Sequence, residues 1–138
     1  MPIVAIHGRL AVTGMLFAGI CVAWGLLNFL RKRPVTGSYW GALIILEALM
    51  VIQVVIGAVV LFSGGQLARP IVHYLYAATA ILSLPAAYVY TRGQDTPREN
   101  LIYAVVCLWL LFIVDRSRAT GVEGTLMPAF TMFGAWLP

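Results

Sequence analysis

The feature that most constrains this chain is a set of long segments with almost no charge. A helix needs about 20 apolar residues to cross a lipid bilayer, and three runs are long enough: 10–30, 39–62 and 70–90. The second run is interrupted by two strongly polar residues, Glu47 and Gln53. Only 10% of the 138 residues are charged, whereas soluble domains carry roughly 25%. The sequence therefore predicts an integral membrane protein built from helices.

A fourth apolar run, 101–114, is too short to span a bilayer by itself. It follows Thr96, Pro97 and Glu99, which are typical of a helix N-terminus with a capping residue, a first-turn proline and a capping-box glutamate. A helix that starts there and ends near Arg118 would be long enough. Because the connections are short, successive helices are expected to be antiparallel neighbours. The expected fold class is all-α: an integral membrane four-helix up-down bundle, with spans at about 7–30, 39–62, 70–90 and 97–118.

Two further features complete the expected organisation. Pro85 should kink the third helix, because proline lacks the backbone N–H. Residues 1–120 form the expected bundle, and residues 121–138 form an apolar tail that is too short to span and is broken by Pro128. This tail is expected to lie at the membrane interface or against a partner.

The basic residues predict how the bundle is oriented. Three lie in the first connection and two in or beside the third, which face the same side: Arg31, Lys32, Arg33, Arg92 and Arg98. Positive residues gather on the cytoplasmic side of a membrane protein. The expected location is therefore the bacterial inner membrane, with both termini outside. The excess of basic residues reports this topology, and nothing in the sequence predicts a nucleic-acid partner.

The only two histidines of the chain share one local pattern. His7 begins HGRLAVTG and His73 begins HYLYAATA, which agree as His-x-x-x-Ala-x-Thr-small. Both lie near the start of helices that run in the same direction, so we expect them at a similar depth. An ionisable residue inside a span is a functional hypothesis by default. Small residues follow each histidine on the same helix face: Ala11 and Gly14 on the first helix, Ala77 and Ala80 on the third.

A histidine at the head of a small-residue groove suits a porphyrin. Two facing imidazoles would fill both axial positions of one haem iron within a helical bundle. Arg9 and Arg69 fall at the level where the haem propionates would emerge, and arginine pairs well with carboxylates. The competing interpretation is ordinary helix packing through small residues, with histidines and arginines at the membrane interface. Zinc is disfavoured, because it takes three or four protein ligands.

Three segments together resemble the haem A synthase family: HGRLAVTG, IQVVIGAVVLFSGG and RPIVHYLYAATA. One four-helix half of that family carries His-Arg-x-x-Ala, then a Gln-x-x-x-Gly helix, then a second His-x-x-x-Ala. The resemblance covers about residues 7–90 and implies a haem-binding membrane bundle. It implies that His7 and His73 bind haem near the outer face, with Gln53 and Gly57 at the matching positions of the second helix.

The chain also departs from that family's pattern. It has one four-helix half where the family has two, Gly8 separates His7 from Arg9, and no acid precedes His7. The paired loop cysteines of the family are missing as well. The resemblance therefore implies haem binding rather than haem oxygenation.

The sequence as a whole predicts a small b-type membrane cytochrome with one haem b per chain. With both axial positions filled, electron transfer is favoured over enzymatic catalysis. The expected partners are membrane lipid, the other subunits of a larger respiratory or photosynthetic complex or further copies of the chain, and quinone. Two alternatives stay open: a small four-helix proton-coupled transporter that uses Glu47, and a haem-free structural subunit.

Overall fold

The computed structural model describes residues 2–121 of the chain, so the predicted tail beyond Gly121 lies outside the described residues. The described part contains four α-helices and no strand: α1 (Pro2–Leu30), α2 (Gly37–Phe62), α3 (Pro70–Thr91) and α4 (Pro97–Gly121). The all-α prediction is confirmed for these residues. Each helix is long and apolar enough to cross a membrane.

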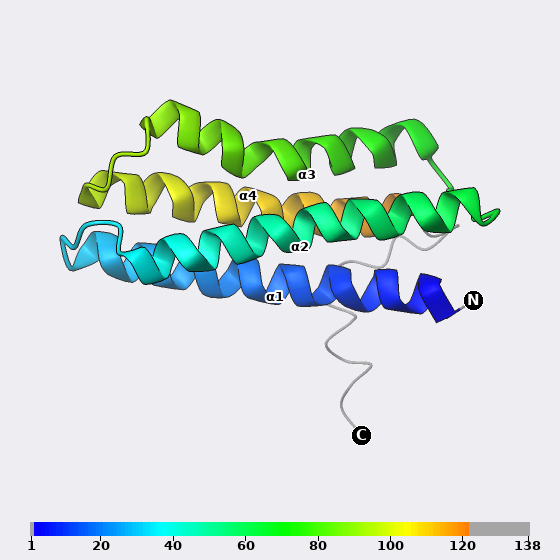
Figure 1. Cartoon of the computed structure of the whole chain (residues 1–138), viewed down its shortest axis with the longest axis horizontal. Coiled ribbons are helices and arrows are strands. Elements are labelled where there is room, and N and C mark those ends of the chain that lie inside the picture. The colour runs from blue at the N-terminus through cyan, green and yellow to red at the C-terminus, as the bar shows by residue number, and fades with distance from the viewer. Residues whose placement is uncertain (1, 122–138) are drawn as a thin grey trace, which may run out of the picture.

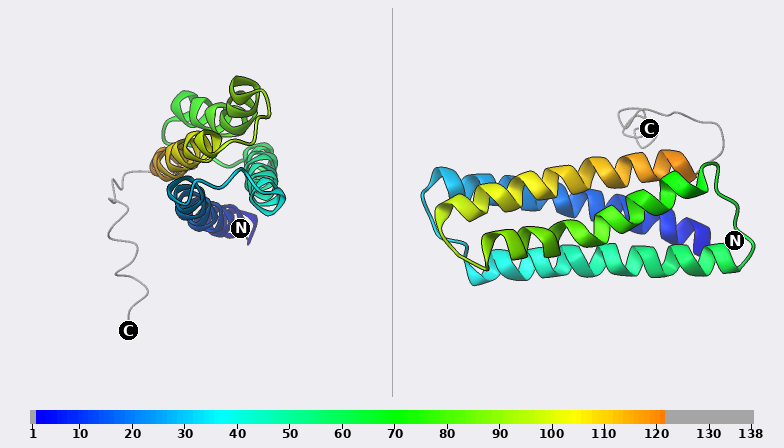
Figure 2. Two further views of the ribbon diagram at one scale, coloured as in Figure 1. Left: turned by 90° about the vertical axis from the view of Figure 1, so that its left-hand side faces the viewer. Right: turned by 90° about the horizontal axis from the view of Figure 1, so that it is seen from above.

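The helices lie side by side and alternate in direction (Figure 1). Each helix packs against the helices that precede and follow it, and α4 closes the ring against α1 (Figure 2). Among neighbouring helices, the α1–α4 contact is the most extensive and the α2–α3 contact the least. The start of α1, the connection 63–69 and the end of α4 therefore share one end of the bundle. The connections 31–36 and 92–96 share the other end, where the Val35 N–H donates to the Asp95 carbonyl at 2.7 Å.

The helix boundaries follow the sequence signals with two differences. α4 begins at Pro97 as expected, but the Thr96 hydroxyl donates to the Glu99 carboxylate instead of accepting from the backbone at that position. α1 begins at Pro2 rather than near His7, so His7 lies in the second turn of the helix. Pro85 lies inside α3, which continues through it to Thr91.

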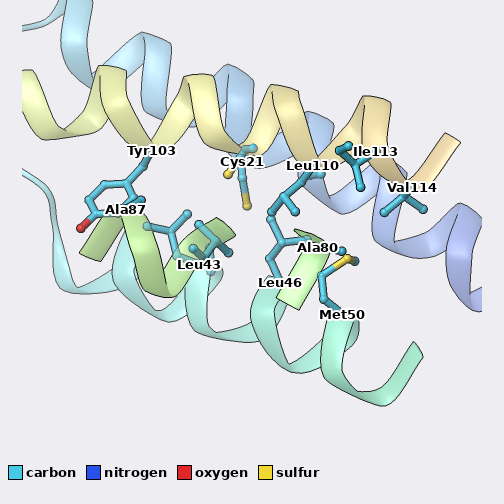
Figure 3. Packing of buried hydrophobic residues seen from close by; sticks show 14 of the residues in the cluster. Cys21, Leu43, Leu46, Met50, Ala80, Ala87, Tyr103, Leu110, Ile113 and Val114 are labelled. Atoms are coloured by element: carbon cyan, nitrogen blue, oxygen red, sulfur yellow. The ribbon is translucent and has the colours of Figure 1, made fainter. Parts of the chain in front are cut away.

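The core is made of apolar side chains and a few large rings (Figure 3). Gly25 of α1 lies directly against the Tyr39 hydroxyl of α2, where a methyl group would collide with it. This approach lets Tyr39 donate to the carbonyl of Cys21 at 3.0 Å. Trp40 packs edge-on against Tyr103, with ring centroids 5.0 Å apart. These contacts tie α1, α2 and α4 together, while many large apolar side chains of all four helices face outward.

Candidate functional site

The two histidines lie at the same end of the bundle, on helices that run in parallel. His7 comes from α1 and His73 from the first turn of α3. Residues of α2 contact the ring of His7 and residues of α4 contact the ring of His73, so each histidine is held by a second helix at this end of the bundle.

The ring of His73 is held by the last turns of α4. Its Nδ1 lies 3.0 Å from the carbonyl oxygen of Ser117 and 3.3 Å from the hydroxyl of Thr120. A carbonyl oxygen can only accept, so Nδ1 must be the nitrogen that carries the proton. In the neutral ring, Nε2 then keeps its lone pair. The fold therefore fixes the tautomer of His73 in the form that can bind a metal through Nε2.

The ring of His7 is held by α2. The Gln53 amide nitrogen donates to the His7 carbonyl at 3.0 Å and lies 3.4 Å from Nε2 of the same residue. Because that nitrogen is a donor, Nε2 of His7 is the acceptor and Nδ1 carries the proton. Nδ1 of His7 and Oε1 of Gln53 are both buried and have no hydrogen-bond partner among the described residues. Two complementary polar atoms thus remain unsatisfied beside the ring.

Gly57 forms the floor under the His7 ring. A methyl group added at Gly57 would lie 3.0 Å from Cε1 of the imidazole, closer than ordinary van der Waals contact. Gly57 follows Gln53 by four residues, so both lie on one face of α2, where one binds the ring and the other makes room for it. The Gln-x-x-x-Gly pattern therefore positions the ring of His7 against α2.

The small residues after each histidine face the core, and one of them lies against a side chain of α2. Ala11 and Gly14 are buried on α1, and Ala80 is buried on α3, while Ala77 is half-buried. The space above Gly14 is filled by the methyl end of Met50, which extends from α2 into the core (Figure 3). In this structure a flexible thioether side chain therefore occupies the space beside Gly14, and the groove predicted there stays a prediction.

The arginines expected near the haem propionates lie at the histidine end. Arg9 and Arg69 are exposed, and the backbone N–H of Arg69 donates to the Thr120 carbonyl at 3.2 Å. This bond ties the connection before α3 to the end of α4, which also holds His73. Arg118 reaches α1, where its Nη1 lies 3.8 Å from the sulfur of Met15.

Ser117 and Thr120 are the site residues that sequence reasoning missed. They lie three residues apart, so they share one face of α4, and the Thr120 hydroxyl donates to the Ser117 carbonyl at 2.8 Å. The available signal in the sequence was the three-residue spacing of Ser117 and Thr120 near the end of an apolar helix. That spacing alone does not tell which neighbouring helix the face meets.

Glu47 stands apart from this site. It lies six residues before Gln53 on α2, toward the opposite end of the bundle, and is half-buried. Its Oε2 is buried without a hydrogen-bond partner in the described part of the chain. The structure therefore leaves Glu47 as a separate polar feature rather than a member of the histidine cluster.

The chemistry of the site is limited by its few ligating groups. Residues 2–121 contain no cluster of three or more His, Cys, Asp or Glu side chains that could hold a metal ion. These residues therefore do not provide the three or four protein ligands that a bare zinc-like ion needs. An iron whose equatorial positions are filled by a porphyrin needs only two protein ligands. Comparison with protein families, curated proteins and solved structures gives no match.

Proposed function

We propose that this chain is a small b-type membrane cytochrome that holds one haem b between His7 and His73. The observation that carries the proposal is the hydrogen bond from Nδ1 of His73 to the Ser117 carbonyl, at 3.0 Å. Metal-binding histidines almost always donate their second ring N–H in this way, which fixes the tautomer and orients the ring. When bound, the haem supplies a one-electron couple at its iron.

The residues around His7 suit the second axial position. Gln53 holds His7 through two contacts, and the stronger one, at 3.0 Å, goes to the backbone carbonyl rather than the ring. Nε2 of His7 can therefore exchange its 3.4 Å contact with Gln53 for a metal while the helices stay joined. The unpartnered Oε1 of Gln53 and Nδ1 of His7 are the kind of buried polar atoms that call for a further partner.

The surroundings support electron transfer rather than oxygen chemistry. His7 and His73 would both hold the iron, which would leave it no free position for oxygen or a substrate, and the haem would then supply one-electron transfer. Arg9 and Arg69 are exposed at the same end and suit the propionate carboxylates. Met50, whose methyl end lies against Gly14, has a flexible side chain that can yield to a flat ring. An electron carrier of this size is best suited to work as a subunit of a larger respiratory or photosynthetic complex or as a homo-oligomer, with quinone as a donor.

The location we propose is the bacterial inner membrane. Four apolar helices with large side chains facing outward support a multi-pass protein. The connection 31–36, which holds three basic residues, would face the cytoplasm, and both termini would lie outside.

The proposal is tested by purifying the full-length chain and adding haem. We expect about one haem per chain and the absorption bands of low-spin, six-coordinate iron. Circular dichroism on the same sample reports whether the helices are intact. A helical protein without a Soret band after reconstitution would refute haem binding and leave a haem-free packing subunit.

A second candidate function rests on a different observation, the buried and unpartnered Oε2 of Glu47. Such a carboxyl in an apolar helix suits a proton-coupled transporter, in which proton loss is linked to substrate binding. Protonated carboxyls in apolar surroundings react with dicyclohexylcarbodiimide. Three results together would favour this function over the cytochrome. The reagent would modify Glu47, liposomes containing the Glu47→Gln variant would lose proton-driven transport, and the purified protein would contain no haem.

A further inference from the structure

The end of the bundle opposite the histidines carries a polar pocket. It lies where α3 gives way to α4 and has a volume of about 270 Å³. Seven residues line it: Tyr90, Thr91, Arg92, Gln94, Arg98, Glu99 and Ile102. The proposed cytochrome function does not use this pocket, since both imidazoles lie at the other end.

A tight turn builds the pocket from local backbone geometry. Arg92 ends α3 in the left-handed region with φ of 52°, and Gly93 follows with φ of 65°. These two residues turn the chain so that α4 can begin at Pro97, with Arg98 in its first turn. The last turn of α3 and the first turn of α4 thereby meet, and one arginine comes from each.

The charges in the pocket are unbalanced. Neither Arg92 nor Arg98 makes a hydrogen bond through its side chain or an ion pair with any residue of the described part of the chain. The one acid of the lining, Glu99, is only 3% exposed and already accepts from the Thr96 hydroxyl. The positive end of the α4 helix dipole lies at the same turn. Two arginine side chains at this pocket therefore have no ion-pair partner among the described residues.

We propose that this pocket binds a phosphate group, supplied by an anionic phospholipid. Guanidinium groups form paired hydrogen bonds with phosphate oxygens, which a monovalent halide cannot match. The neighbouring side chains argue for a lipid as the source. Val89 and Tyr90 are 73% and 68% exposed at the end of apolar helix α3, where they can contact acyl chains and glycerol. Basic pockets on the cytoplasmic side of membrane proteins recognise lipid headgroups in this way.

The experiment uses the full-length chain in detergent, with phosphatidylglycerol and phosphatidylcholine titrated separately and bound lipid counted by native mass spectrometry. The pocket variant is Arg92→Asn with Arg98→Gln, since asparagine tolerates the left-handed backbone. The matched control is Arg31→Gln with Lys32→Asn, which removes the same charge from the exposed connection at the same end and likewise has one position with left-handed backbone. Circular dichroism confirms that each variant is folded.

We expect tight binding of phosphatidylglycerol and weak binding of phosphatidylcholine. Each basic residue near a membrane surface contributes enough for about a fivefold change in affinity, so the pocket variant should bind about 25-fold more weakly. The control should change far less. Equal losses in the pocket and control variants, or equal binding of the two lipids, would overturn the phosphate site in favour of a diffuse basic surface.

A separate titration with inorganic phosphate distinguishes the two sources of the phosphate group. Tyrosine fluorescence reports binding, because Tyr90 lines the pocket. We expect inorganic phosphate to bind at least tenfold more weakly than phosphatidylglycerol. Binding that is equally tight and is lost in the pocket variant would overturn the lipid assignment and identify a soluble phosphate compound as the ligand.

Discussion

Replacing Gly57 with alanine tests the seating of His7 with the smallest possible change. The added methyl would lie 3.0 Å from Cε1 of the imidazole, whereas carbon atoms at optimal separation are about 3.5–4.0 Å apart. The ring must therefore retreat by about 0.5 Å, which is the tolerance within which a functional group must be held. Overpacking of this kind typically costs about 1–3 kcal/mol, equivalent to a fall in haem affinity of about 5- to 150-fold.

The matched control for this variant is Gly41→Ala on the same helix, where an added methyl meets nothing within 4 Å. Both substitutions raise the helix propensity of α2 by about 1 kcal/mol, so the difference between them isolates the contact with His7. Haem titration followed at the Soret band gives the two affinities, and circular dichroism gives the helix content. If Gly57→Ala binds haem as tightly as Gly41→Ala, then His7 does not hold the iron in the ring position described here.

Three further predictions follow from other parts of the molecule. His7→Ala and His73→Ala should each lose the low-spin spectrum, and the two losses should be strongly non-additive because both residues act on one iron. Added imidazole should restore the spectrum in each single variant but not in the double variant. An unchanged spectrum in either single variant would remove that residue from the site. Asn100→Ala should lower the free energy of unfolding by about 1–3 kcal/mol, because it leaves the buried amide of Asn28 and the part-buried carbonyl of Arg33 without their partner. Denaturation in detergent that matches the unaltered chain would contradict this. In intact cells, a membrane-impermeant maleimide should label Gln66→Cys but not Ser38→Cys, both being exposed at opposite ends of the bundle; the reverse pattern would invert the topology.

Much of the fold follows from the sequence because a membrane span leaves the backbone few options. Without water to satisfy N–H and C=O groups, an apolar run of span length must be helical. The start of α4 was also predictable, since Thr96, Pro97 and Glu99 are specific signals of a helix N-terminus. The start of α1 was not. Its first turns contain His7 and Arg9, which shorten the apolar run. The helix nevertheless begins at Pro2, because no residue between Pro2 and His7 breaks it.

The site was predictable in part, for a geometric reason. The repeat around His7 and His73 fixes their place along two parallel helices, so their common depth could be inferred from order and length alone. The partners on α4 could not be inferred in this way. Each residue turns a helix by about 100°, so the rotation of α4 decides whether Ser117 and Thr120 meet His73 or the lipid. That rotation depends on the packing of the whole α3–α4 interface rather than on a local pattern.

The stripe of small residues on α1 illustrates why one pattern can serve two interpretations. Gly25 receives the Tyr39 ring and Gly14 receives the methyl end of Met50, so both glycines act as packing sites in this structure. The two contacts differ in what they could become. Tyr39 is rigid and is anchored by its hydrogen bond to Cys21, so that end of the stripe is committed to helix packing. Met50 is unbranched and flexible, and it lies nearer to His7, so the end of the stripe where a porphyrin is proposed is also the end that can still open.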